Sequence, residues 1–234
     1  MDYTSVQKKL REQADEEIAT HSKRFFKTGK GQYGEGDKFL GIRVPVQRKV
    51  AKSHKELPLQ GVEKLLQSEY HEERLTAVFI LTYKFEKGDE ELREKVYHYY
   101  MENIGMINNW DLVDSSAPKI VGPHLENRDR SVLYDLAGSD NLWSRRIAIM
   151  SCMHFINQGD FSDAQNIAEL LLHNEHDLIH KAVGWALREI GNKDMAAEEK
   201  FLKSHYQQMP RTMLRYAIEK FPEQKRKAYL KGII

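Results

Sequence analysis

The stretch Asn108-Asn-Trp-Asp-Leu-Val-Asp-Ser-Ser-Ala-Pro-Lys-Ile120 decides how the rest of the chain is interpreted. Its apolar residues, Leu112 and Val113 among them, recur at helical spacing and predict a helix over residues 108–121. Trp110 and Asp114 lie four residues apart, so they share one helix face. An aromatic ring beside a carboxylate suits a cationic ligand, because the face of the ring attracts positive charge. For an isolated pair, a core tryptophan next to a surface acid is the commoner arrangement. The choice between that arrangement and a ligand site therefore depends on the rest of the sequence.

Helical periodicity continues along nearly the whole chain. Apolar residues from Val6 to Ile18 predict one helix over residues 3–27, and residues 28–38 form the one long loop. No segment alternates apolar and polar residues over the length of a strand. Further helices are predicted near residues 45–53, 58–67, 70–86, 89–103, 108–121, 129–137, 141–157, 162–173, 177–190, 194–207, 210–220 and 222–231.

A repeat underlies these helices. A small or branched apolar residue recurs at helix centres, usually beside basic residues, at Ala77, Val113, Ala148, Ala182 and Ala217. The intervals are 36, 35, 34 and 35 residues, and two helices per interval are typical of an α-solenoid. The tetratricopeptide pattern does not recur, which favours HEAT-like repeats. We therefore predict an all-α HEAT-like superhelix, one domain over residues 1–234, with a concave binding surface.

Composition sets the broad class of protein. The chain has 234 residues, of which 41% are hydrophobic and 30% charged, and its net charge of +1 is not by itself a nucleic-acid signature. No apolar run is long enough for a membrane span, and the first residues lack the apolar core of a signal peptide. The single cysteine, Cys152, excludes an intramolecular disulfide. We expect a cytoplasmic monomer with no membrane partner.

Four segments, taken together, resemble the AlkD family of DNA alkylation repair glycosylases. They are Lys38-Phe-Leu-Gly-Ile-Arg-Val-Pro45, Asn109-Trp-Asp-Leu-Val-Asp114, Ser139-Asp-Asn-Leu-Trp-Ser-Arg-Arg-Ile-Ala148 and His180-Lys-Ala-Val-Gly-Trp-Ala-Leu-Arg-Glu189. The resemblance runs from about residue 20 to 225. It implies a HEAT-like α-superhelix that holds duplex DNA in a concave cleft. It also implies hydrolysis of the N-glycosidic bond of N3- or N7-alkylated purines, such as 3-methyladenine and 7-methylguanine, without a metal or organic cofactor.

The same resemblance assigns site residues. The family's cleft residues correspond to Trp110, Asp114, Arg146 and Trp185 in this sequence. Of these, Asp114, Trp110 and Trp185 are the predicted catalytic residues, and Arg146 is a predicted DNA-binding residue. One position departs from the family pattern, because Phe25 stands where a tyrosine lies near the DNA in a family member. That change removes a hydroxyl hydrogen bond to a phosphate or base edge.

These residue types fit the chemistry. Alkylation at N3 or N7 makes the purine cationic and a good leaving group, so the bond can break to give a sugar with oxocarbenium character. One carboxylate, Asp114, then suffices to stabilise the cation and orient water. The faces of Trp110 and Trp185 would contact the sugar as its positive charge develops. Arg146 would bind a phosphate through its forked guanidinium.

Other basic residues are candidates for phosphate binding. They lie at predicted helix starts or on the helices expected to line the concave surface, whereas acidic residues gather elsewhere, as in Glu86–Glu94 and Glu198–Glu199. Such segregation allows a nearly neutral protein to bind DNA in a salt-dependent way. The candidates are Arg43, Arg48, Lys49, Lys181, Arg188, Arg211 and Arg215.

Several other patterns are interpreted as structural. The Gly-x-Gly-x-x-Gly sequence from Gly29 to Gly34 follows no strand, so it is not a dinucleotide site. His173, His176 and His180 straddle a turn without further ligands, and we expect solvated histidines and no metal. Trp143 is expected in the core. No lysine is placed as a Schiff-base nucleophile, so strand-cleaving lyase activity is not expected.

Two other classes of function are compatible with the sequence. A non-catalytic solenoid could bind distorted DNA, and a helical repeat could instead serve as a protein-binding scaffold. Release of 7-methylguanine from duplex DNA would separate an enzyme from both, and salt-dependent affinity for DNA would separate the two from each other.

Overall fold

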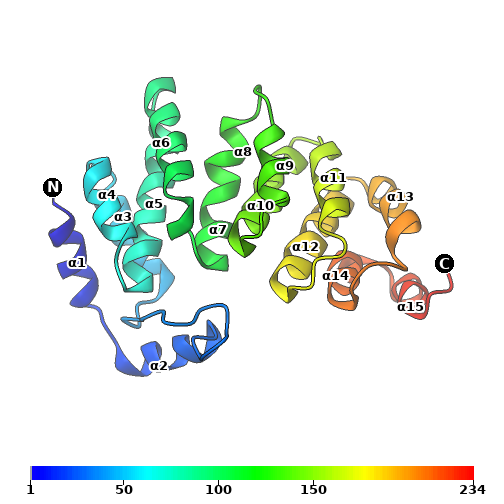
Figure 1. The fold of residues 1–234 in the computed structure, drawn as a ribbon, viewed down its shortest axis with the longest axis horizontal. Helices are drawn as coiled ribbons and strands as arrows, with labels where there is room; N and C mark the ends of the chain where they lie inside the picture. Colours follow the sequence, from blue (N-terminus) through cyan, green and yellow to red (C-terminus); the bar gives the residue numbers. More distant parts are fainter. Residues whose placement is uncertain (1) are drawn as a thin grey trace. The chain divides into compact units, whose positions relative to one another are not determined.

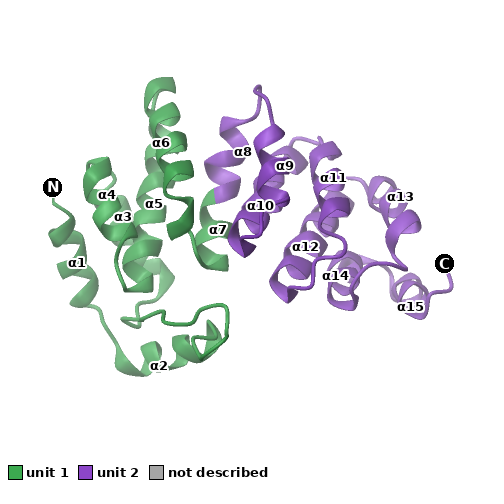
Figure 2. Cartoon of the chain, in the orientation of Figure 1, with its two compact units in different colours: residues 1–116 green, residues 117–234 purple. Residues whose placement is uncertain are grey.

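The computed structural model describes residues 2–234, most of which lie in helices (Figure 1). The described residues contain no strand, and the one β-bridge, between Lys38 and Tyr70, is isolated. The predicted all-α helical-repeat fold is therefore confirmed. The chain divides into two compact units, Met1–Ser116 and Ala117–Ile234 (Figure 2). The expectation of one continuous solenoid domain stays a prediction.

Unit 1 is built around one buried helix. Its helix α5 packs against α3, α4, α6 and α7, and its side chains are buried continuously from His71 to Thr82. A helix buried on all sides lies at the centre of a layer instead of at its surface. The helices of this unit are α1 (Tyr3–Arg11), α2 (Glu16–Phe25), α3 (Val44–Ser53), α4 (Leu59–Leu66), α5 (His71–Lys87), α6 (Glu90–Glu102), η1 (Ile104–Met106) and α7 (Trp110–Ser116).

The prediction of one helix over residues 3–27 is wrong, because the helix is interrupted between α1 and α2. Asp15 is the N-cap of α2, and its carboxylate accepts a hydrogen bond of 2.9 Å from the amide of Ile18. Gly41, with φ of +82°, lies so close that a Cβ there would meet the Asp15 carbonyl oxygen at 1.9 Å. The Asp15 cap and the close approach of Gly41 explain why α2 begins as a separate helix. Apolar periodicity alone predicts that the first helix continues through this point.

The predicted helix over residues 108–121 is also interrupted. Helix α7 ends at Ser116, and a single 3₁₀ turn, η2 (Ala117–Lys119), separates it from α8 (Val121–His124). Pro118 has no amide proton and its ring obstructs an α-helix, which accounts for the break. The helix that carries Trp110 and Asp114 is therefore only seven residues long.

Unit 2 is a stack of helices in which α10 and α12 are central. Helix α12 packs against α10 on one side and α14 on the other. Gly184 of α12 allows the second contact, because a Cβ there would meet the Met213 carbonyl oxygen at 2.5 Å. The helices of this unit, after η2 and α8, are α9 (Ser131–Ala137), α10 (Leu142–Asn157), α11 (Ser162–Leu170), α12 (Asp177–Lys193), α13 (Met195–His205), α14 (Arg211–Ala217), η3 (Ile218–Lys220) and α15 (Glu223–Lys231).

The repeat seen in the sequence has a physical basis in both units. The recurring residues Ala77, Val113, Ala148, Ala182 and Ala217 are all completely buried. They sit on α5, α7, α10, α12 and α14, which are the helices that pack on their neighbours within each unit. None of the helices formed by residues 2–234 is long and apolar enough to cross a membrane.

Candidate functional site

Trp110 opens helix α7 and belongs to an aromatic cluster. Its indole stacks on Phe26, with ring centroids 5.3 Å apart and planes 14° from parallel. The Phe25 ring makes a T-shaped contact with the same indole, with ring centroids 5.9 Å apart, and Phe25 is 56% exposed. The indole itself is half-buried. Trp110 is thus held in place by packing while part of its ring system reaches the surface.

Asp114 lies one turn further along α7 and is partly exposed. The intervening Leu112 and Val113 are fully buried, so α7 turns its other face to the core. Below this helix the Tyr100 hydroxyl lies 2.9 Å from the Ser116 hydroxyl. Burial raises the pKa of Tyr100, and the negative charge of Asp114 raises it further. The structure therefore places Trp110 and Asp114 on one short, well-anchored helix, as the i and i+4 spacing predicts.

A buried ionic cluster lies next to Trp110, and sequence reasoning missed it. The imidazole of His71 contacts two carboxylates, with Nδ1 2.8 Å from Asp37 and Nε2 2.8 Å from Asp111. Arg74 donates to Asp37 at 2.5 Å. Burial opposes a charge on the ring, but Asp111 and Asp37 outweigh it and raise the pKa of His71 to about 9. We call Asp37, His71, Arg74 and Asp111 the ionic cluster.

A second buried carboxylate orders the segment that precedes α3. Glu72 accepts hydrogen bonds from the backbone amides of Leu40, Gly41 and Ile42, at 2.9, 2.8 and 3.2 Å. A buried carboxylate that receives three amide donors is well satisfied. This contact holds residues 40–42 against α5, just before the exposed Arg43, which is the N-cap of α3.

Two of the four predicted cleft residues lie in unit 2, Arg146 on α10 and Trp185 on α12. Arg146 is only 4% exposed, and its guanidinium donates to the Leu178 carbonyl at 2.5 Å. Trp185 is partly exposed, and its indole N–H donates to the Glu189 carboxylate at 2.9 Å. Trp143, expected in the core, is 9% exposed. Arg146 is therefore anchored within its unit, and only a small part of its side chain reaches solvent.

The other basic candidates differ in exposure. In unit 1, Arg43 and Lys49 are exposed, while the guanidinium of Arg48 lies 4.0 Å from the centre of the Phe79 ring. In unit 2 the candidates lie on α12 and α14, which pack together. There Lys181 pairs with Asp177 at 2.6 Å, Arg188 pairs with Glu219, Arg211 donates to the Leu230 carbonyl at 2.7 Å, and Arg215 is exposed.

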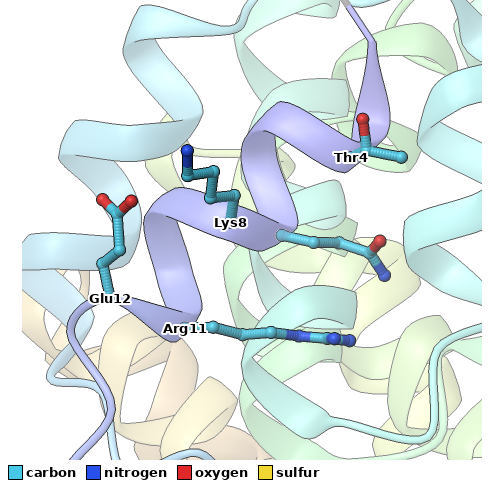
Figure 3. Close-up of a pocket in the computed structure, with 5 residues that line it drawn as sticks. Thr4, Lys8, Arg11 and Glu12 are labelled. Atoms are coloured by element: carbon cyan, nitrogen blue, oxygen red, sulfur yellow. The ribbon is translucent and has the colours of Figure 1, made fainter.

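Within residues 2–234 no three His, Cys, Asp or Glu side chains are grouped so that they could hold a metal ion. His176 caps α12 by accepting from the amide of Leu178. An open pocket of about 540 Å³ lies along α1, lined by Thr4, Gln7, Lys8, Arg11 and Glu12 (Figure 3). It contains none of the predicted site residues.

Comparison with known proteins identifies the family. The family model described as DNA alkylation repair enzyme matches residues 6–221. A solved structure described as a predicted DNA alkylation repair enzyme from Enterococcus faecalis matches with a TM-score of 0.71 and 19% identity. That match covers 90% of this chain and 98% of the other, and it shows a shared fold. No curated protein matches the chain. The chain therefore belongs to the family of DNA alkylation repair enzymes, which gives it a role in the repair of alkylation damage to DNA.

Proposed function

We propose that this protein is a monofunctional DNA glycosylase that hydrolyses the N-glycosidic bond of cationic alkylpurines in duplex DNA. Its substrates would be purines alkylated at N3 or N7, such as 3-methyladenine and 7-methylguanine. The observation that carries the proposal is the placement of Trp110 and Asp114 one turn apart on a short helix. This helix is anchored by the buried Leu112 and Val113. Membership of the DNA alkylation repair family supports the choice of substrate.

The proposed reaction begins with departure of the base. The bond between C1′ of the deoxyribose and the purine nitrogen breaks, and its electron pair neutralises the positive charge on the purine. The sugar is left with oxocarbenium character, which the Asp114 carboxylate stabilises by its negative charge. Water then adds to C1′ and loses a proton to Asp114 or to solvent. The charge of the leaving group replaces a general acid in this scheme.

The tryptophans would add to the same stabilisation. An indole face attracts a cation more strongly than a neutral group, so its contact with the sugar strengthens as the bond breaks. Trp110 is prepared for this role by its stacking on Phe26, which fixes the ring before any ligand arrives. Trp185 is held by its hydrogen bond to Glu189. We propose both as sugar contacts.

The basic residues would bind phosphates. Contacts of this kind position the duplex and carry no sequence information. In unit 1 the exposed Arg43 and Lys49 are suited to it, and in unit 2 the exposed Arg215 and Arg211. Arg146, Arg48, Lys181 and Arg188 already have protein partners, which restrict the movement of their charged groups before a phosphate binds.

Base release under single-turnover conditions tests the proposal. Duplex oligonucleotides would carry 7-methylguanine, 3-methyladenine, uracil or 1,N6-ethenoadenine, and free base would be measured by chromatography. We expect release of the two cationic purines only, because a neutral base departs slowly without an acid to protonate it. Comparable rates on charged and neutral lesions would contradict the proposed selectivity. Salt-dependent DNA binding without base release would indicate a non-catalytic DNA-binding protein. If neither DNA binding nor base release is found, the result would indicate a protein-binding scaffold.

A further inference from the structure

We propose that His71 is a positioning residue, an imidazolium that joins the glycine-rich loop to the start of α7 and fixes where Trp110 and Asp114 project. The glycine-rich loop is the segment of residues 28–38, which ends with Asp37 and Lys38. The inference rests on the proposed function in one respect, because it concerns the orientation of the helix that carries the proposed catalytic carboxylate.

Three separate segments meet at the imidazole. His71 is the first residue of α5, Asp37 comes from the glycine-rich loop and Asp111 is the second residue of α7. Both carboxylates lie 2.8 Å from a ring nitrogen, one at each side. Asn109, just before α7, also donates to Asp37 at 3.4 Å. The ring therefore ties the loop and α7 to the central helix of unit 1.

With Asp37 and Asp111 ionised, the two hydrogen bonds require a charged ring. An ionised carboxylate accepts hydrogen bonds but cannot donate them, so both ring nitrogens must carry protons. The ionic cluster then holds two positive groups, His71 and Arg74, and two negative ones, Asp37 and Asp111. These side chains are between 2% and 12% exposed, so an unbalanced charge there would be costly. A proton on His71 makes the buried set neutral.

The electrostatic surroundings of the ring favour the same charged state. The groups that face the ring are Asp37 from the loop, Asp111 from α7 and Arg74 from α5 itself. Burial disfavours the charged ring, but the two carboxylates raise the pKa of His71 to about 9. His71, with Arg74, lowers the pKa of Asp37 despite its burial. Near neutral pH the imidazolium is therefore the stable form.

The same ring also takes part in the aromatic packing beneath Trp110. Its centroid lies 4.7 Å from Phe26 and 4.7 Å from Phe39, and Phe26 stacks in turn on Trp110. Attraction between the imidazolium and the aromatic rings holds Phe26 in this position. Loss of the proton would weaken that attraction and leave one carboxylate without its donor.

The connection to α7 distinguishes His71 from the other buried ions of unit 1. Glu73 joins Arg11, Gln7 and Ser68 to α5, and Glu72 orders residues 40–42, without any contact to α7 among those bonds. Asp111, by contrast, stands directly between Trp110 and Leu112 at the start of that helix. A shift of Asp111 therefore shifts the residues on both sides of it.

The charge on the ring can be measured directly. The full chain labelled with ¹⁵N-histidine would be studied by two-bond ¹H–¹⁵N correlation spectra at pH 7.5, with His71→Gln used to assign the signal. We expect both nitrogens of His71 to be protonated. A neutral tautomer at that pH would overturn the proposal. The measurement uses the wild-type chain and needs no activity, so it separates this inference from the glycosylase assignment.

The positioning role is tested with Asp111→Asn. The variant removes one negative charge, so Asp37 and Arg74 balance without a proton on His71. The pKa of the ring should fall, and base release should be lost at a lower pH than in the wild type, with DNA affinity within about twofold. Asp163→Asn is the matched control, because it removes a similarly shielded carboxylate from the Arg130 pair of unit 2. Its pH profile should match the wild type.

His71→Gln supplies the second readout. We expect single-turnover release to slow by on the order of 100-fold, since small displacements of reacting groups cost about that much, while DNA affinity is retained. Amides of α7 should exchange with solvent faster in this variant. An unchanged pH profile in Asp111→Asn together with unchanged α7 exchange in His71→Gln would overturn the role. If the wild type releases no base, the glycosylase proposal fails, and the spectra and exchange data still decide this one.

Discussion

The indole of Trp110 lies nearly parallel to the ring of Phe26, although 84 residues of sequence separate them. The contact packs the residue that follows α2 against the first residue of α7. A side chain held in this way needs no reorganisation when a ligand arrives, which is the condition under which electrostatic stabilisation is most effective. Substitutions at and around α7 should therefore act on rate more than on binding.

Asp114→Asn should abolish most base release. The amide preserves the size of the side chain but removes the charge that balances the oxocarbenium, so we expect a loss on the order of 100-fold or more. Fold and DNA affinity should be retained. Single-turnover release of 7-methylguanine measures the effect, and Asp135→Asn, at an exposed position on α9, is the control. Near wild-type rates in Asp114→Asn would remove Asp114 from the mechanism.

Arg146→Ala should weaken binding to alkylated and undamaged duplex alike. Loss of one phosphate contact lowers the slope of log affinity against log salt by about one unit. Titrations at several salt concentrations measure it. Lys95→Ala is the control, because Lys95 is exposed and paired with Glu91 in an acidic region. An unchanged salt slope would contradict the prediction. It would assign Arg146 to packing within unit 2, where its guanidinium donates to the Leu178 carbonyl.

The stability of unit 1 should fall at alkaline pH. The pKa of His71 is raised from an ordinary value of 6.5 to about 9 in the folded chain. Its contribution to the free energy of unfolding is therefore complete below about pH 6.5 and is lost as pH rises through about 9. The difference corresponds to about 3 kcal/mol. Urea unfolding at pH 6, 7.5 and 9 measures it, and His71→Gln should lose most of this alkaline dependence.

Glu198→Gln should stabilise the protein at neutral pH. Glu198 is 1% exposed, and burial, with the neighbouring Glu199, raises its pKa to about 8. The folded state thus holds a proton that the unfolded state releases above about pH 4.5, and stability declines as pH rises from there to about 8. The amide removes this cost, a gain of up to about 3 kcal/mol at pH 7. No gain over wild type at pH 7, or a gain that persists at pH 4, would contradict it.

Gly184→Ala should destabilise unit 2. A Cβ at this position would meet the Met213 carbonyl and the Tyr216 Cβ, both at 2.5 Å, so α12 and α14 would have to separate. Overpacking of this kind costs about 1 to 3 kcal/mol. Gly138→Ala is the control, because the nearest atoms to its added Cβ lie at 3.6 Å and 3.7 Å. Equal melting temperatures for the two variants would contradict the prediction.

The sequence was sufficient for the fold class because local and repeating patterns carried it. Apolar periodicity placed α5, α10 and α12, and the 35-residue interval identified residues that are all fully buried. It failed at Asp15 and Pro118, where a cap and a missing amide interrupt a pattern that would otherwise continue. Both signals are present in the sequence, but the apolar periodicity runs across them and predicts one uninterrupted helix in each case.

The ionic cluster was beyond sequence reasoning for a different reason. Asp37, His71 and Asp111 come from three segments, and each alone resembles an ordinary polar residue at a loop or helix start. They come together only in the folded chain. Asp111 does lie in the same stretch as Asp114, directly after Trp110. This position is the one feature of the sequence that associates Asp111 with the candidate site.

The ionic cluster also has a consequence for how the chain is made. Asp37 and His71 are separated by 34 residues, and a further 40 residues separate His71 from Asp111. During synthesis from the N-terminus, a nascent chain that includes Arg74 but not Asp111 has only Asp37 to balance the guanidinium, so its His71 ring stays neutral. The chain must therefore extend into α7 before His71 takes up its second proton. Trp110 and Asp111 emerge together, so the last ion of the ionic cluster arrives with the helix that it sets in place.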